Sequence, residues 1–364
     1  MTVRRPRLAR RPRLLIAAAA VAVAAGIAVP VELHAAAARD AAACTLDNPI
    51  GVGADPSVVR HDGHYYLAQS DGQRSITITR SRTIAGLGTA TPTVIWTAPA
   101  GTDHSAETWA PEIEYLRGRW VVYFAAATDR GGDPATNATH RVFALTADTA
   151  DATGHWSFAG GIVGDATHWA IDPSVFRYRG SWWMTWSGTP AGNGGDAPQQ
   201  ITIARMTDPL HVDASTTTTI GRPTRAWEHA VQAIEEGPEP WVGPDGTLTI
   251  VYNADASWTS HYALGELVHD GSANLTDPSS WGKRGPVLTS GGHVTGPGGE
   301  SAPVRGPGGV LWNIYHAKTG TQDGWDDRAL FAAPVHWRPD GTPDFGGTAA
   351  GTTSFDEQTG RACR

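Results

Sequence analysis

The sequence has 364 residues, with 28 Lys and Arg against 36 Asp and Glu and a formal net charge of −8. This acidic balance argues against nucleic acid or an anionic membrane surface as a partner. It is compatible with a neutral ligand.

The first 38 residues have the pattern of a bacterial export signal. Six arginines between positions 4 and 13 precede an apolar run at 14–29, and four alanines at 35–38 offer a cleavage site. The apolar run is short for a membrane span of about 20 residues, which disfavours an uncleaved anchor. The pair Arg10-Arg11 fits a twin-arginine signal and an ordinary basic segment equally well. We expect a secreted bacterial protein, whose mature chain 39–364 has a net charge of −13.

One phrase recurs five times along the mature chain. Each copy starts near a proline, reaches a glycine six to eight residues later, and continues with apolar and aromatic residues. The copies cover residues 55–70, 110–126, 172–187, 237–253 and 302–317. Their opening prolines, Pro56, Pro111, Pro173, Pro240 and Pro303, lie 55, 62, 67 and 63 residues apart. Such a period indicates a repeat architecture with units the size of a four-stranded propeller blade.

Each copy is predicted to form a strand, a glycine turn and a second strand. The second strands are apolar on both faces, as in residues 120–124 and 311–315, which indicates burial on both sides. Strand-like runs at 75–80, 140–145, 200–205 and 261–267 would each add a third strand. No long amphipathic helix is visible. The sequence therefore predicts an all-β protein, with 39–364 folded as a single five-bladed β-propeller.

The two cysteines lie close to the two ends of the mature chain. Cys44 and Cys363 can pair in an exported protein, and a propeller brings its first and last strands together in one blade. We expect a disulfide. Two unpaired thiols, or lipidation at Cys44, are the alternatives.

Three acids open inner strands of the predicted blades. Asp55, Asp172 and Glu236 belong to blades one, three and four, and equivalent positions of successive blades should meet at one end of the axis. Glycoside hydrolysis needs two carboxyl groups across the scissile bond, and a third acid can raise the pKa of the proton donor. The structural alternative is that Asp-Pro is a strand-entry dipeptide that caps backbone amides. The shared repeat position favours a catalytic cluster.

The phrases together resemble glycoside hydrolase family 43, whose members are five-bladed arabinofuranosidases, arabinanases and xylosidases. The resemblance rests on ADPSVV (54–59), WAPEI (109–113), IDPSVF (171–176), EGP (236–238) and HWRPDGTPDFG (336–346). It implies Asp55 as general base, Asp172 as the acid that tunes the pKa, Glu236 as general acid, and inversion at the anomeric carbon. Glu235 and Glu239 are alternatives for the acid, because either Pro238 or Pro240 could open blade four. The family's Glu-Gly-Pro pattern selects Glu236.

Two further residues are candidates for substrate binding. The resemblance places Arg328 at the sugar pocket, where a guanidinium can donate to hydroxyl groups and fix carboxylates. Trp109 is a candidate sugar platform. Their alternatives are a surface arginine beside two aspartates and a tryptophan in core packing. Glu112 could join the ring of acids, or it could point away from the axis.

The chain departs from the family at one position. Many relatives read Gly-Pro-Gly-His before blade five, and that histidine reaches a metal or water in the central channel. Gly299 stands there instead, and His293 or His316 could compensate. We expect no cofactor and no tightly held metal. A structural calcium ion is the alternative, which the missing histidine disfavours.

The sequences of these motifs are most similar to those of the arabinofuranosidase branch of the family. The resemblance thus implies that the substrate is a plant cell-wall polysaccharide or oligosaccharide. It also implies that the enzyme releases terminal α-L-arabinofuranose from arabinan or arabinoxylan. We expect the protein to be a monomer. A β-xylosidase or endo-arabinanase of the same family is one alternative. A non-catalytic sugar-binding propeller is another, although a pure binder has no use for a carboxylic acid with a raised pKa.

Overall fold

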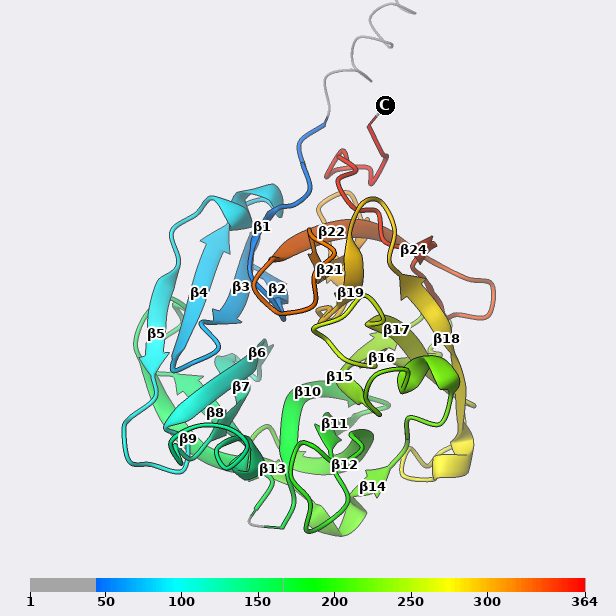
Figure 1. Cartoon of the computed structure of the whole chain (residues 1–364). Coiled ribbons are helices and arrows are strands. Elements are labelled where there is room, and N and C mark those ends of the chain that lie inside the picture. The colour runs from blue at the N-terminus through cyan, green and yellow to red at the C-terminus, as the bar shows by residue number, and fades with distance from the viewer. Residues whose placement is uncertain (1–43, 166, 364) are drawn as a thin grey trace, which may run out of the picture. The chain divides into compact units, whose positions relative to one another are not determined.

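The computed structural model describes residues 44–165 and 167–363, and the predicted export signal 1–38 lies outside them. Five sheets surround a central axis, which confirms the predicted all-β, five-bladed propeller (Figure 1). Their strand pairs are antiparallel except for the parallel pairing of β18 with β24. They belong to a compact unit that begins at Thr45. None of the helices in the described part is long and apolar enough to cross a membrane.

In the first three blades the strands follow one another in chain order from the axis outward, except that β13 and β14 of blade three both pair with β12 (Figure 1). Blade one consists of β2 (Ser57–His61), β3 (His64–Ser70), β4 (Ser75–Ser81) and β5 (Thr93–Thr97). Blade two consists of β6 (Ala106–Leu116), β7 (Arg119–Ala127), β8 (Arg141–Ala147) and β9 (Trp156–Val163). Blade three consists of β10 (Ala170–Tyr178), β11 (Ser181–Gly188), β12 (Gln200–Asp208), β13 (His211–Val212) and β14 (Thr218–Thr219).

The last two blades include strands from distant parts of the chain. Blade four consists of β15 (Glu235–Val242), β16 (Leu248–Ala254), β17 (Ala263–His269), β18 (Trp281–Thr289) and β24 (Gly347–Thr348). Blade five consists of β19 (Thr295–Gly298), β20 (Val304–Arg305), β21 (Leu311–Lys318), β22 (Arg328–Trp337), β23 (Pro343–Asp344) and β1 (Gly51–Val52). Strand β1 pairs with β22 and thereby joins the start of the described chain to the last blade.

The helices that connect these strands are single 3₁₀ turns. They are η1 (Ala85–Gly88), η2 (Asn137–Thr139), η3 (Ala214–Thr216), η4 (Ala226–Glu228) and η5 (Pro278–Ser280). The predicted third strands at 75–80, 140–145, 200–205 and 261–267 correspond to β4, β8, β12 and β17.

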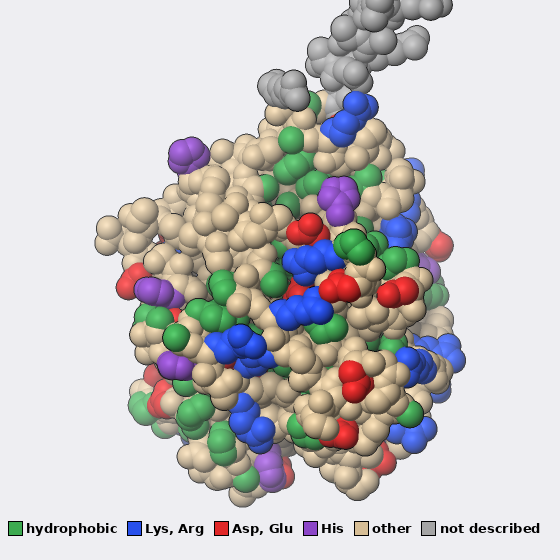
Figure 2. Space-filling model, turned by 90° about the vertical axis from the view of Figure 1, so that its right-hand side faces the viewer, with side chains coloured by type: hydrophobic (Ala, Val, Ile, Leu, Met, Phe, Trp, Pro, Cys, Tyr) green, Lys and Arg blue, Asp and Glu red, His purple; other side chains and the backbone are tan. Residues whose placement is uncertain are grey.

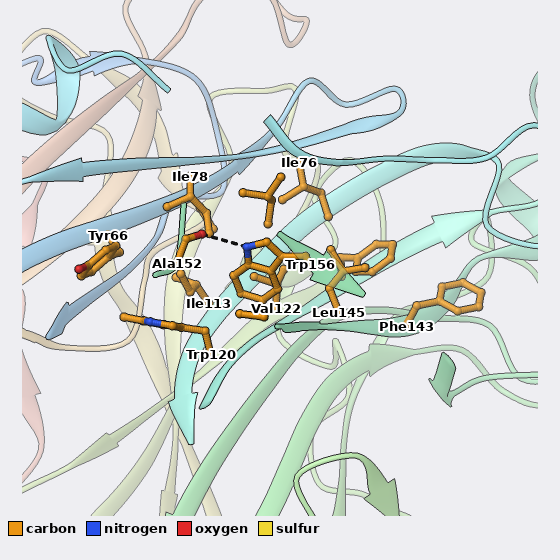
Figure 3. Packing of buried hydrophobic residues seen from close by; sticks show 14 of the residues in the cluster. Tyr66, Ile76, Ile78, Ile113, Trp120, Val122, Phe143, Leu145, Ala152 and Trp156 are labelled. Atoms are coloured by element: carbon orange, nitrogen blue, oxygen red, sulfur yellow. Dashed lines mark hydrogen bonds between the residues drawn. The ribbon is translucent and has the colours of Figure 1, made fainter. Parts of the chain in front are cut away.

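The second strands are buried on both faces, as predicted. Every residue of β16 and β21 is buried, and so is every residue of β7 after Arg119. One hydrophobic cluster lies between blades one and two, where Tyr66 and Ile78 meet Ile113 and Trp120 (Figure 3). Because each sheet is covered by its neighbours, the apolar side chains on both of its faces are removed from contact with water, which stabilises the fold.

The ends of the propeller are held together by more than the pairing of β1. Both cysteines are disulfide-bonded, and the chain has only these two, so Cys44 pairs with Cys363. The expectation of a disulfide is confirmed. Leu46 also forms an antiparallel bridge with Phe355.

Charged side chains of both signs are mixed on the outer face shown in Figure 2, with hydrophobic side chains scattered between them (Figure 2). The net acidity of the chain is therefore not gathered into a single-sign patch on this face.

Candidate active site

The inner strands of blades two, three and four share one irregularity. Their register with the second strand shifts between Trp109 and Glu112, between Ile171 and Ser174, and between Glu236 and Glu239. Each shift inserts one extra residue, a β-bulge, and bulges commonly re-aim a side chain beside an active site. The residue within each bulge has a positive φ: 41° at Ala110, 52° at Asp172 and 54° at Gly237.

Asp55 has the same backbone conformation, with φ 45°, just before β2. Left-handed backbone at a non-glycine residue is strained by an amount on the order of 1 kcal/mol. Two aspartates at equivalent positions, Asp55 and Asp172, carry this strain. The repeat thus turns both carboxyl groups in the same direction relative to their blades.

The bulges also show which residues open blades four and five. Pro238 follows the positive-φ residue Gly237, as Pro56 follows Asp55, so Pro240 is not the equivalent proline. In blade five Gly299 has φ 53° and is followed by Glu300. Of the two prolines that the sequence left open for blade four, Pro238 is therefore the opening one and Pro240 is not. The expectation that Pro303 opens blade five is wrong, since the backbone conformation rather than the proline defines the repeat.

A pocket of about 760 Å³ opens where the five inner strands meet, and residues from all five blades line it. The lining includes every residue predicted from sequence to act on substrate: Asp55, Trp109, Asp172, Glu236 and Arg328. The structure therefore brings the three acids, the arginine and the tryptophan into one site.

Asp55 lies against a histidine and an arginine of blade five. Its backbone N–H donates to Nδ1 of His316 (3.2 Å), and the same nitrogen lies 3.3 Å from Oδ1 of Asp55. Nη1 of Arg328 is 4.0 Å from Oδ2. Burial opposes ionisation of Asp55, but the adjacent His316 side chain and the positive charge of Arg328 outweigh it and lower the pKa of the carboxyl. Asp55 is therefore ionised at neutral pH.

Asp172 has an opposite electrostatic environment. Its Oδ2 accepts one hydrogen bond, from the backbone N–H of Gly237 (3.0 Å). Burial and the negative charge of Asp55 raise the pKa of Asp172 to about 7, although the Gly237 contact opposes them. Asp172 thus exchanges a proton near neutral pH.

Glu236 is 9% exposed, and Oε1 accepts a hydrogen bond from the hydroxyl of Tyr262 (2.9 Å). Burial and the neighbouring Asp172 raise the pKa of Glu236 well above its usual range, against the opposing effect of the Tyr262 bond. A carboxyl group in this environment holds a proton at neutral pH and can donate it.

The two alternatives for the acid, Glu235 and Glu239, have other partners than Glu236. Glu235 forms an ion pair with Lys283 and does not line the pocket. Glu239 lines the pocket but accepts a hydrogen bond from Ser174 (3.1 Å) in the inner strand of blade three. Burial raises the pKa of all three acids. The charges of Asp172 and Asp55 both raise the pKa of Glu236 further, whereas other neighbours shift the pKa values of Glu235 and Glu239.

Glu239 belongs to a second group of buried carboxyls along the axis. Burial raises the pKa of Glu112 to about 8 and that of Glu300 to about 8, and these two neighbours further raise the pKa of Glu239. Glu112 therefore does face the pocket. Protons on these groups at neutral pH keep several close carboxyls from repelling one another.

Arg328 and Trp109 form parts of two different walls. The Arg328 side chain is 21% exposed, and its Nε donates to the backbone carbonyl of Trp325 (3.2 Å), so it is not a free surface arginine. Trp109 stacks on His140 with ring centroids 3.9 Å apart, and its remaining surface lines the pocket. One face of the indole is thus used in packing.

The structure also explains the missing histidine. A side chain at Gly299 would begin 2.4 Å from Nδ1 of His316 and 2.5 Å from Oδ1 of Asp55. His316 therefore occupies the space beside the base that a residue at 299 would need. Burial holds the pKa of His316 below its usual value, although the neighbouring Asp55 opposes this.

Within the described residues, no group of three or more His, Cys, Asp or Glu side chains is arranged to hold a metal ion. The residues around Gly299 thus do not fit the metal-binding arrangement of the wider family, and we derive no catalytic step from a metal. The absence of a cofactor stays a prediction.

Two residues of the site were not singled out as site residues from the sequence. Tyr262 follows a turn in blade four, and no motif marked it. His316 was considered only as a substitute for the missing histidine. Its position in a buried strand, where the preceding residues are apolar, is the one signal that could have identified it.

Comparison with known proteins identifies the family. The family model for glycosyl hydrolases family 43 matches residues 46–343. The chain belongs to this family. An extracellular exo-α-(1→5)-L-arabinofuranosidase from Streptomyces avermitilis is 31% identical over 323 residues, which cover 85% of this chain and 65% of the relative. Alpha-L-arabinofuranosidase 43 from Humicola insolens is 30% identical, with 80% of this chain and 61% of that relative covered.

The matched part of this family 43 chain thus spans somewhat less than two thirds of those two relatives. Among solved structures, the crystal structure of an α-L-arabinofuranosidase from Lactobacillus brevis superposes with a TM-score of 0.77 at 30% identity. That match covers 84% of this chain and 98% of the other.

Proposed function

We propose that this protein is a secreted, exo-acting glycosidase that releases terminal α-L-arabinofuranose from arabinan, arabinoxylan or their oligosaccharides. The observation that carries the proposal is the opposed ionisation of two carboxyls in one pocket. Asp55 has a lowered pKa and Glu236 a raised one. Pairs of this kind divide the roles of base and acid.

In the proposed reaction the terminal sugar binds between these two groups. Glu236 donates its proton to the oxygen of the leaving group while Asp55 accepts a proton from the attacking water, which forms the new bond at the anomeric carbon. A single displacement inverts the configuration at that carbon. Asp172 lies beside both acids and raises the pKa of Glu236. Arg328 lies close enough to Asp55 to keep it ionised and oriented.

The choice of arabinofuranose is supported by the relatives. The Streptomyces protein and the Lactobacillus structure both carry arabinofuranosidase in their names, at 31% and 30% identity. The extracellular location of the Streptomyces protein supports secretion. A non-catalytic sugar-binding propeller is disfavoured, because burying several carboxyls with raised pKa values is costly for a protein that only binds.

Purified mature protein tests the proposal with aryl α-L-arabinofuranoside, aryl β-D-xyloside and linear arabinan. We expect release of arabinose from the first and third substrates, with proton NMR showing the β-anomer as the first product. A double variant, Asp55→Asn with Glu236→Gln, is the control for contaminating glycosidases. Faster hydrolysis of the xyloside, internal cleavage of arabinan, or retention of configuration would each contradict the corresponding part of the proposal.

A further inference from the structure

An exposed tryptophan lies at the rim of the pocket. Trp325 is 54% exposed, and of the exposed large hydrophobic side chains in the described part it is the one aromatic residue that lines the pocket. Trp258 lines the pocket beside it, with ring centroids 5.3 Å apart and planes inclined at 63°. The two indoles form one aromatic corner, which we name the rim pair.

The rim pair is held in place by bonds between two loops. Trp258 lies in the turn after β16, and Trp325 lies between β21 and β22. The indole N–H of Trp325 donates to Oγ of Ser257 (3.2 Å), and the backbone N–H of Gly324 donates to the carbonyl of Trp258 (2.8 Å). The buried Lys318 donates to the same carbonyl (3.0 Å). A platform fixed in this way loses little conformational entropy when a ligand binds.

Two of the groups that contact Asp55 and Glu236 stand where the same two loops end: Arg328 begins β22, and Tyr262 directly precedes β17. Arg328, three residues after Trp325, donates to the Trp325 carbonyl and faces Asp55. Tyr262, four residues after Trp258, donates to Glu236. The rim pair is thus tied to both sides of the catalytic centre, although Glu236 is far more buried than Trp325.

We propose that the rim pair is the binding platform for the sugar residues on the leaving side of the scissile bond. This inference rests on the proposed function. In exo cleavage the terminal sugar occupies the deepest position, between Asp55 and Glu236, and the rest of the substrate leaves through the mouth of the pocket. An indole more than half exposed at that mouth meets the leaving part, and its face can pack on the apolar face of a sugar ring.

The experiment compares two substrates that differ only in the leaving part. Arabinotriose has a leaving group of two sugar residues, whereas α-L-arabinofuranosyl fluoride releases a fluoride ion that cannot occupy the platform. For Trp325→Ala and Trp258→Ala we expect kcat/KM on arabinotriose to fall about fivefold to tenfold. On the fluoride we expect less than a twofold change. Trp325→Phe should retain most of the activity on arabinotriose.

The matched control is Phe158→Ala. Phe158 is an exposed aromatic residue of β9, 41% exposed, and it does not line the pocket. Both substrates should be cleaved by this variant at the wild-type rate. If the tryptophan variants lost kcat/KM equally on both substrates, or lost none on arabinotriose, the platform proposal would be wrong while the proposed function would stand. A wild-type protein that cleaves neither substrate would overturn the proposed function, and the platform with it.

Discussion

The hydroxyl of Tyr262 sets the pH range over which the proposed acid stays protonated. It donates to Oε1 of Glu236 (2.9 Å) and thereby stabilises the ionised carboxylate. Tyr262→Phe removes this donor and keeps the ring, which stacks on His316 at 5.9 Å with planes 13° apart. Without the donor the pKa of Glu236 rises, so the acid keeps its proton to a higher pH. The basic limb of the activity profile should move upward.

The size of the shift follows from the strength of the bond. A hydrogen bond to a charged group contributes about 1.5–3 kcal/mol. One pKa unit corresponds to about 1.4 kcal/mol. Protonated Glu236 can keep part of the contact by donating to the tyrosine oxygen, so only a part of the bond's free energy separates the two protonation states. We expect an upward shift of about one pH unit.

The assay is the pH dependence of kcat/KM on arabinotriose, because kcat/KM reports the ionisation of the free enzyme. Tyr252→Phe is the matched control, since the Tyr252 hydroxyl also donates to a buried carboxyl, Glu228 (2.8 Å), but neither residue lines the pocket. The Tyr252→Phe variant should lose a comparable amount of folding stability, while the basic limb of its pH profile should stay where it is in the wild type. An unchanged or lowered basic limb in Tyr262→Phe would refute the assignment of Glu236 as the acid.

Four further outcomes are expected. Asp55→Asn and Glu236→Gln should each lower kcat by several orders of magnitude. A substrate with a good aryl leaving group should partly rescue Glu236→Gln but not Asp55→Asn, because such a leaving group needs little protonation. Full activity of either variant would remove that residue from the mechanism. His316→Ala should raise the pKa of Asp55 and move the acidic limb upward, and a profile without that movement would mean that His316 does not support the base. The double variant Cys44→Ser with Cys363→Ser removes a disulfide that closes a loop of more than 300 residues. In the chain-entropy account this closure contributes about 5 kcal/mol, so the Tm should fall by roughly 10 °C. An unchanged melting curve would contradict this expectation. Exhaustive EDTA treatment should leave kcat unchanged, and loss of activity restored by calcium would disprove the metal-free prediction.

The propeller could be predicted because its signal is local and repeated. A glycine turn followed by a strand that is apolar on both faces occurs in every blade, and burial between neighbouring sheets is the physical reason for it. The opening position of blades four and five was misplaced by two or three residues. In blade four this position depends on a bulge that lies between Glu236 and Glu239 and does not include Pro240. In blade five the positive-φ residue is Gly299, and Pro303 stands four residues after it.

The candidate site was predictable only in part. Asp55, Asp172 and Glu236 stand in the repeated phrase or directly beside it, and all three line the pocket. Their partners could not be predicted in the same way, because Tyr262 is 26 residues from Glu236 and His316 is 261 residues from Asp55. The contact of His316 with Asp55 arises when blades five and one meet around the axis, whereas that of Tyr262 with Glu236 forms within blade four. The repeat carries no information about either contact.

The division of labour among the acids therefore does not originate in the repeat. Asp55 and Asp172 share the same Asp-Pro-Ser-Val sequence and nearly the same φ, 45° and 52°, yet their pKa values move in opposite directions. Asp55 meets His316 and Arg328 of blade five, whereas the one hydrogen bond of the Asp172 carboxyl comes from the Gly237 backbone. One structural element thus yields an ionised carboxylate, which is the proposed base, and a carboxyl that exchanges protons near pH 7, because each faces a different neighbouring blade. Exchanging those neighbours, rather than altering the repeat, is the change that would reassign the roles of the two aspartates.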